Sequence, residues 1–173
     1  MAIFSEKKDT KKKLVEGIIL QKYNRYYRLA YSYVHNESDA LDIVQNGAYK
    51  AIKSSHSLSR TEYAETWVYR IMLNECFAFL RQRRPLSYEE LQEENGIETG
   101  STLDRYSNID LQRALDSLSK EDKAIVILKF FEGMTLEEIA AIMDENVNTI
   151  KSRLYRGMRK LRDLLSDEEN GTI

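Results

Sequence analysis

Basic, hydroxyl and aromatic side chains recur at helical spacing in the C-terminal third of the chain. At 100° per residue they share one side of a predicted helix, and aliphatic residues take the other side. The polar side holds Lys151, Ser152, Tyr155, Arg156 and Arg159, and the apolar side holds Ile150, Leu154, Met158 and Leu161. Such a helix docks through its apolar face and offers cations to phosphates and guanine edges, as a DNA recognition helix requires.

A shorter predicted helix precedes the basic one and supplies the first half of a helix-turn-helix. Thr135 and Glu138 have the spacing of a capping box. The apolar residues of one face follow at helical spacing: Leu136, Ile139, Ala140 and Met143. Residues 144–146 predict the turn, with Asn146 as the next N-cap. A basic face alone is usually just solvated, but these features occur together and in order, which favours DNA binding.

The charge distribution supports this interpretation better than the net charge does. The 173-residue chain carries a formal net charge of −2, which taken alone argues mildly against nucleic-acid binding. Residues 147–163, however, carry a net +5, and residues 88–110 carry a net −6. A DNA phosphate meets the local field, so the segregation matters more than the total.

The pattern of elements predicts an all-α fold of two small helical domains joined by a flexible acidic linker. The predicted boundaries are 1–85 for the first domain, 86–108 for the linker and 109–173 for the second domain. In the first domain we expect helices over 14–34, from a Ser38 cap to about 54, and over 64–84, with a polar loop at 54–62. Pro85 ends the third helix.

The second domain is expected to begin with a helix whose apolar stripe is Leu111, Leu115 and Leu118. Ser119 to Asp122 then predict a new helix start, with Ile125, Leu128 and Phe131 buried behind it. Gly133, after Glu132, predicts the end of that helix.

Composition narrows the function classes. A single cysteine, Cys76, allows no internal disulfide and no cysteine-based zinc cluster, and we expect it to be a buried small side chain. We find no signal peptide and no apolar run long enough to span a membrane, so we expect a cytoplasmic protein. No catalytic constellation, glycine-rich phosphate loop or metal cluster is present in the sequence, so we expect neither an enzyme nor a cofactor.

Two separate motif sets resemble the extracytoplasmic-function (ECF) group of RNA polymerase sigma factors, in the sigma-70 family. Residues 136–140 and 149–156 resemble region 4, residues 39–45 resemble region 2.2, and residues 66–71 with Asn74 and residues 80–81 resemble region 2.4. The resemblance covers nearly the whole chain in the family's order. It implies a protein that binds core RNA polymerase, directs it to promoters and helps to open the −10 region.

The resemblance also implies roles for individual residues. Lys151, Ser152, Tyr155, Arg156 and Arg159 would face −35 DNA, and Asn74, Arg70, His56 and Ser57 would face the −10 element. The sequence does not say which residue of the loop would capture a flipped base, since Ser55 and Ser59 are also available. Asp39, Asp42 and Gln45 would contact the polymerase. The family commonly answers to a membrane-bound anti-sigma factor, often in an envelope or extracellular stress response, so we expect an anti-sigma factor as partner and no small-molecule substrate.

Three residues depart from the family's usual pattern. Gly47 lies inside a predicted helix and would weaken it by about 1 kcal/mol, which suggests a soft or repacked segment. Asp144 stands where a turn glycine is common, and aspartate tolerates a left-handed backbone. Asn148 replaces a usual glycine and could add a DNA contact.

Three other function classes make different demands on the sequence. A two-domain regulator with a similar helix-turn-helix would need an upstream receiver or ligand domain, and the first block shows no alternating strand and helix pattern. An enzyme is disfavoured for the reasons above. A pure protein-interaction module would bind polymerase or an anti-sigma factor yet show no salt-dependent DNA affinity.

Overall fold

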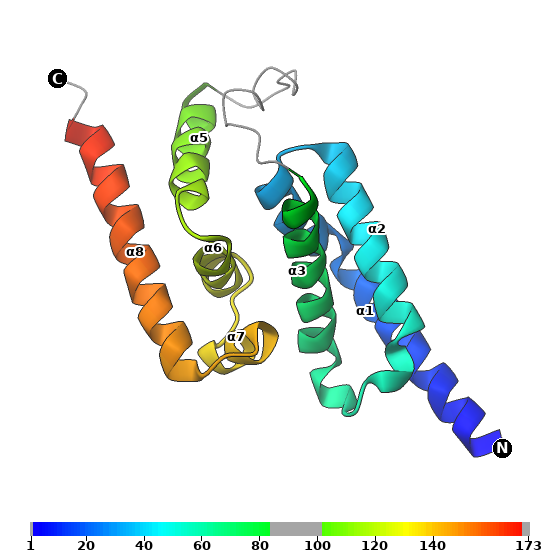
Figure 1. Ribbon diagram of the computed structural model, residues 1–173. Coiled ribbons are helices and arrows are strands. Elements are labelled where there is room, and N and C mark those ends of the chain that lie inside the picture. Colours follow the sequence, from blue (N-terminus) through cyan, green and yellow to red (C-terminus); the bar gives the residue numbers. More distant parts are fainter. Residues whose placement is uncertain (1, 84–101, 171–173) are drawn as a thin grey trace. The chain divides into compact units, whose positions relative to one another are not determined.

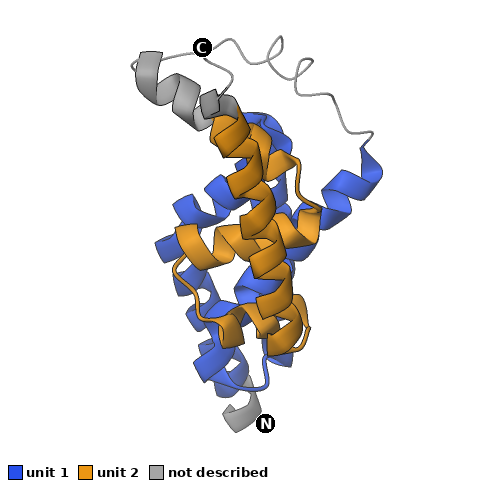
Figure 2. Ribbon diagram, turned by 90° about the vertical axis from the view of Figure 1, so that its left-hand side faces the viewer, with its two compact units in different colours: residues 1–85 blue, residues 86–173 orange. Residues whose placement is uncertain are grey.

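The computed structural model describes the backbone of residues 2–83 and 102–170, and the side chains of residues 6–83 and 109–167. The chain divides into two compact units, Met1–Pro85 and Leu86–Ile173 (Figure 2). Both units are helical, and the described ranges contain no strand, as the all-α prediction requires. The acidic segment expected to form the linker lies mostly outside the described residues.

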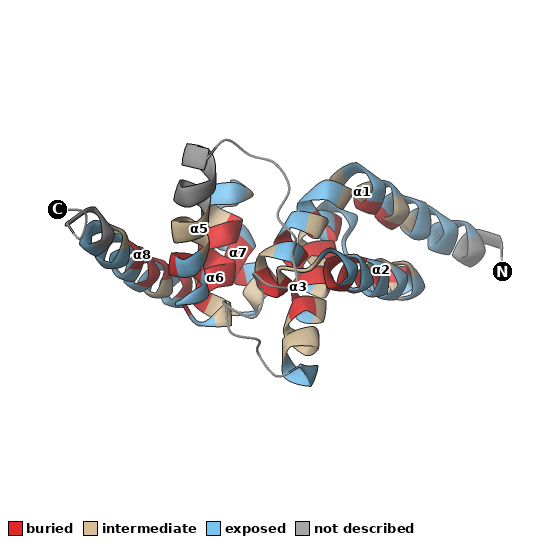
Figure 3. Ribbon diagram, turned by 90° about the horizontal axis from the view of Figure 1, so that it is seen from above, coloured by how far each residue is buried: buried red, intermediate tan, exposed pale blue. Residues whose placement is uncertain are grey.

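Unit 1 is a bundle of three helices (Figure 1). They are α1 (Ala2–Val34), α2 (Glu37–Lys53) and α3 (Ala64–Gln82), and each packs on the other two. Apolar residues from all three helices fill the bundle interior, including Val15, Leu29, Ile43, Val44 and Met72, each at most 2% exposed. Figure 3 shows the buried residues of unit 1 gathered where α1, α2 and α3 face one another. Cys76 is buried on α3, as expected.

Two details of unit 1 differ from the sequence-based expectation. Asn36, not Ser38, caps α2: its side chain accepts a hydrogen bond from the N–H of Asp39 at 3.0 Å. The predicted polar loop contains two short 3₁₀ helices, η1 (Ser55–Ser57) and η2 (Thr61–Tyr63), of which η1 also contacts α1.

Gly47 is a point of close packing between α2 and α3, in line with the repacked segment suggested by the sequence. It is buried on α2, where a Cβ atom would collide with the sulfur of Met72 from α3. Met72 is only 1% exposed, so its thioether fills the space that glycine leaves open. The missing side chain therefore lets α2 and α3 approach closely.

Unit 2 contains α5 (Thr102–Asp116), α6 (Lys120–Val126), the π-helical turn η3 (Ile127–Phe131), α7 (Leu136–Met143) and α8 (Val147–Asn170). The long helix α8 packs against α5, α6 and α7. Ile125, Leu128, Ile139 and Ile150 are fully buried at this junction. Helix α5 begins inside the segment expected to be linker.

The expected burial of Phe131 is wrong, since Phe131 is 58% exposed. Ile125 and Leu128 are buried as predicted, but the π-helical turn η3 follows them. A π turn holds more residues than an α turn, so it rotates later side chains away from the 3.6-residue periodicity. Phe131 therefore points outward even though simple helical spacing places it inside.

Candidate nucleic-acid interface

Backbone geometry fixes the turn between α7 and α8. The capping box at the start of α7 is complete: Thr135 Oγ1 accepts from the N–H of Glu138 at 3.2 Å, and the Glu138 carboxylate accepts from the N–H of Thr135 at 2.8 Å. Asp144 ends α7 in the left-handed conformation with φ 56°. Asn146 Oδ1 then accepts from the N–H of Asn148 at 2.8 Å at the start of α8. The predicted helix-turn-helix is confirmed in each of these particulars.

The two faces of α8 differ in burial as the sequence predicts. Ile150, Leu154 and Leu161 are buried against the rest of unit 2. The opposite face is exposed and holds the five predicted residues Lys151, Ser152, Tyr155, Arg156 and Arg159. One assignment is wrong: Met158 is 38% exposed, and the contact beside it is made by Gly157, which is buried against Val126.

Arg156 is held by a carboxylate that the sequence analysis missed. Its Nη2 donates to both carboxylate oxygens of Asp122, at 2.9 and 3.2 Å. The Asp122 side chain is 9% exposed, whereas that of Arg156 is 66% exposed. Arg153 also lies 3.6 Å from Asp122, and its other terminal nitrogen lies 3.6 Å from Glu145. A buried acid thus ties the exposed cationic face of α8 to α6.

Ser119 explains why Asp122 escaped notice. Its hydroxyl caps α6 by accepting from the N–H of Asp122 at 3.1 Å, so Asp122 reads from sequence as an ordinary first-turn acid. Acids are common there because they complement the helix dipole. One feature of the sequence could have indicated this contact. Asp122 is an acid in the first turn of α6, and Arg153 and Arg156 lie on α8, which packs over α6.

The residues expected at the −10 element all lie in unit 1. Asn74 and Arg70 are exposed on α3, and His56 and Ser57 are exposed in η1. His56 Nδ1 lies 3.2 Å from the carbonyl oxygen of Lys53, and Ser57 Oγ donates to the carbonyl of Ser54 at 2.7 Å. At 1.5 Å per residue, Asn74 lies about 15 Å along α3 from the end that meets the loop. The four residues therefore form an extended surface and not a compact cluster.

The three residues expected to contact polymerase differ in accessibility. Asp42 and Gln45 are exposed on α2. Asp39 is 7% exposed, and its carboxylate pairs with Arg83 just beyond α3. The Asp39 carboxylate is therefore used inside unit 1, where it ties the start of α2 to the end of α3.

The pKa of the Tyr27 phenol on α1 is raised above its ordinary value. Burial raises the pKa of its phenol, and the nearby Glu37 carboxylate raises it further. Both effects disfavour the phenolate, since it is a charged form that burial desolvates and a second negative charge repels. Tyr27 also stacks on Tyr31, with ring centroids 6.0 Å apart.

No group of three or more His, Cys, Asp or Glu side chains is placed to hold a metal ion among the residues that the structure covers. No helix in the same ranges is long and apolar enough to cross a membrane.

Comparison with known protein families identifies both units. Residues 18–85 match the model of sigma-70 region 2, and residues 108–161 match that of sigma-70 region 4. The RNA polymerase sigma factor SigV of Bacillus subtilis is 40% identical over 95% of this chain and 98% of its own length. The ECF RNA polymerase sigma factor SigE of Mycolicibacterium smegmatis is 32% identical over 91% of this chain and 63% of its own length.

Two solved structures resemble the fold. The sigma factor RpoE of Bartonella quintana, in complex with the anti-sigma factor NepR, is 26% identical, with a TM-score of 0.66 over 87% of this chain and 96% of that chain. CnrH, in complex with the cytosolic domain of CnrY, is 19% identical, with a TM-score of 0.71 over 96% of each chain, and supports the fold alone.

Proposed function

The chain belongs to the ECF group of sigma-70 RNA polymerase sigma factors, and we propose that its two units divide promoter recognition between the −35 and −10 elements. A sigma factor is an initiation factor and not an enzyme: it binds core RNA polymerase and directs it to specific promoters. The unit boundaries of the proposal are 1–85 for the core-binding and −10 unit and 109–173 for the −35 unit.

The outer face of α8 carries the −35 part of the proposal. Its cationic and hydroxyl residues are exposed while the opposite face is buried, so the helix is free to enter a major groove on one side only. Lys151 and Arg159 supply charge for phosphates or guanine edges, and Tyr155, 60% exposed, supplies an apolar edge for a base. Asp122 holds Arg156 and so limits the positions that its guanidinium can take.

The −10 part of the proposal rests on α3 and η1. Asn74 offers an amide that can both donate and accept, which suits the edge of an exposed base. His56 and Ser57 lie in η1, in the polar connection from α2 to α3, and such a connection can supply the hydrogen-bonding rim that an extruded base would need. Their distance from Asn74 along α3 suits a strand that runs over the surface, and not a single closed pocket.

The polymerase contact is assigned to Asp42 and Gln45 because both are exposed on α2. Asp39 contributes indirectly, since its pairing with Arg83 fixes the start of the same helix. We also propose that an anti-sigma factor holds the protein inactive, in a response to envelope or extracellular stress. The support is the family membership and the likeness to RpoE, which was solved with NepR. The proposal includes an anti-sigma factor anchored in the membrane, with this chain held on its cytoplasmic side.

Two substitutions test the division of labour. Holoenzyme with Lys151→Ala should bind −35-containing duplex more weakly but melt the −10 region normally once it is bound at high concentration. Holoenzyme with Asn74→Ala should bind the duplex normally and melt the −10 region poorly, as measured by the permanganate reactivity of unpaired thymines. If both variants impair the same step to the same degree, the two units do not divide the work as proposed.

A further inference from the structure

The first turns of α1 project beyond the three-helix bundle of unit 1. The described residues 6–14 are all exposed except Lys11, which is half-buried, whereas Val15 is fully buried. Figure 1 shows this projection at the end of the bundle where η1 and η2 connect α2 to α3. Residues 6–13 lie before the helix that the apolar pattern predicts from residue 14, so helix α1 begins earlier than expected.

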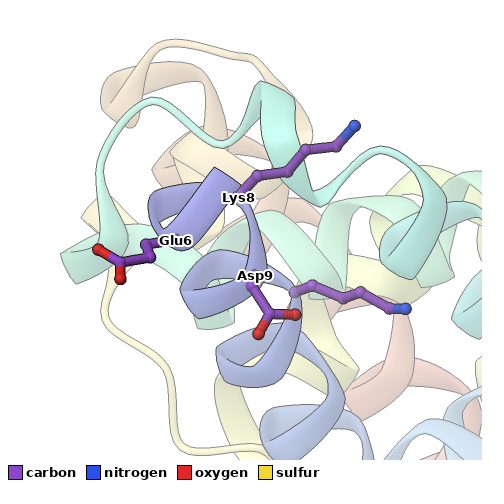
Figure 4. A pocket seen from close by; sticks show the side chains of 4 residues that line it. Glu6, Lys8 and Asp9 are labelled. Atoms are coloured by element: carbon purple, nitrogen blue, oxygen red, sulfur yellow. The ribbon is translucent and has the colours of Figure 1, made fainter. Parts of the chain in front are cut away.

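Four lysines of the projection share one side of α1. At 100° per residue, Lys7, Lys8, Lys11 and Lys12 fall within 140° of each other, and we call them the lysine stripe. The acids Glu6 and Asp9 lie on the other side, where Lys13 pairs with Asp9 at 3.1 Å. Figure 4 shows Lys8 pointing away from Glu6. The charge is therefore sorted by face and not mixed.

The direction of the stripe is set by the buried part of α1. Val15 and Ile19 lie within the same 140° sector, and both pack into the bundle. N-terminal to Val15, α1 extends beyond the bundle, and there the same sector of the helix holds the lysine stripe. The stripe therefore faces the space beside the end of the bundle at which η1 and η2 connect α2 to α3.

Most lysines of the stripe make no ion pair with another residue in the described part of the chain. Lys12 lies 3.9 Å from Glu16, a distant and exposed pair, and the described residues offer no ion pair to Lys7, Lys8 or Lys11. Each turn of a rigid helix presents these charges at a fixed spacing. A line of mainly unpaired lysines, at the end of the bundle that also carries the proposed strand-binding loop, is complementary to a sugar–phosphate backbone.

We propose that the lysine stripe binds backbone phosphates of promoter DNA adjacent to the −10 element. The proposal rests on the proposed function of η1 and α3, because it extends the path of the same DNA along α1. The stripe makes no base contact, so it adds affinity and salt sensitivity without altering promoter sequence preference.

A pair of matched variants tests the stripe. Lys8→Glu and Lys13→Glu change the net charge equally on the same helix. Lys8 lies near the centre of the sector that the lysine stripe covers, whereas Lys13 lies on the side of α1 opposite that centre. Lys8→Glu places a glutamate four residues before Lys12, which favours the helix, whereas Lys13→Glu places one four residues after Asp9, which disfavours it. If function were lost because the end of α1 frays, the control variant Lys13→Glu would therefore lose it and Lys8→Glu would not.

The measurement is holoenzyme affinity for promoter DNA across a salt series. Lys8→Glu should reduce the slope of log affinity against log salt by about 0.7–0.9 relative to Lys13→Glu, the change expected for one lost phosphate contact. Neutral methylphosphonate linkages beside the −10 element should weaken wild-type binding and weaken Lys8→Glu binding less. Neutral linkages at the −35 element should weaken both equally.

The outcomes separate the stripe from the function on which it rests. Equal slopes for the two variants, with normal promoter binding by the wild type, overturn the stripe alone. Equal sensitivity of wild type and Lys8→Glu to the neutral linkages beside the −10 element also overturns it. If the wild-type holoenzyme shows no promoter preference, the proposed function fails, and the stripe proposal fails with it.

Discussion

Replacing Arg156 with alanine should have two effects that can be measured apart. Arg156 belongs to the exposed DNA face of α8, and it also donates two hydrogen bonds to the buried Asp122 carboxylate. Arg156→Ala therefore removes a DNA contact and also removes two hydrogen bonds from the buried Asp122 carboxylate. Arg159→Ala is the matched change, because Arg159 lies on the same face, and no partner is found for it in the described part of unit 2.

The stability cost follows from the geometry. A hydrogen bond to a charged group contributes about 1.5–3 kcal/mol, but solvent competes for a side chain that is 66% exposed. Arg153, 3.6 Å from Asp122, continues to compensate part of its charge. We expect Arg156→Ala to lower the unfolding free energy of unit 2 by about 1–2 kcal/mol, or its melting temperature by roughly 4–16 °C. Arg159→Ala should leave the melting temperature close to that of the wild type.

Calorimetry of the full chain and promoter binding by the holoenzyme, measured well below the transition, separate the two effects. Both variants should weaken −35 binding, but only Arg156→Ala should lower stability. Asp122→Asn should also lower the stability of unit 2. The double variant Asp122→Asn/Arg156→Ala should be only slightly less stable than the less stable of the two single variants, because both substitutions remove the same interaction. Equal melting temperatures for Arg156→Ala and Arg159→Ala would refute the assignment of Arg156 to Asp122.

Three further outcomes are expected. Gly47→Ala should destabilise unit 1 by about 1 kcal/mol in urea unfolding, because crowding against Met72 outweighs the gain in helix propensity, and a stabilised variant would contradict this packing. Thr135→Ala should lower the unfolding free energy of unit 2 by about 1 kcal/mol through loss of the N-cap, whereas an unchanged thermal transition would mean that the cap contributes nothing. The raised pKa of Tyr27 means that the folded state holds the phenol proton more tightly than the unfolded state, so stabilisation is present below about pH 10 and is lost as pH rises further. Tyr27→Phe should flatten that alkaline loss in urea titrations at several pH values, and an identical pH profile would argue against the shift.

The helix-turn-helix was predictable because its signals are local. The Thr135 cap, the turn at Asp144 and the two faces of α8 all depend on residues within a few positions of each other. Local hydrogen bonds and helical phase are written directly in the sequence. The family resemblance added the division between two DNA-binding units, which no single helix reveals.

The features that escaped prediction depend on contacts between distant segments. Asp122 lies 34 positions from Arg156, and Gly47 is explained only by Met72 on another helix. The predicted burial of Phe131 was wrong for a different reason, because a π-helical turn interrupts the helical periodicity on which that prediction relied. The projection of α1 was missed because it lacks an apolar stripe, the signal by which an amphipathic helix is recognised.

Multiple-round run-off transcription on fragmented genomic DNA tests the central claim most directly. Purified core RNA polymerase with this protein should produce transcripts from a defined set of promoters that share −35 and −10 elements, and core alone should not. Holoenzyme carrying Lys151→Ala should lose those transcripts while still forming the complex with core. Transcription without promoter selectivity, or an unchanged transcript set with Lys151→Ala, would contradict the account of α8 as the −35 reader.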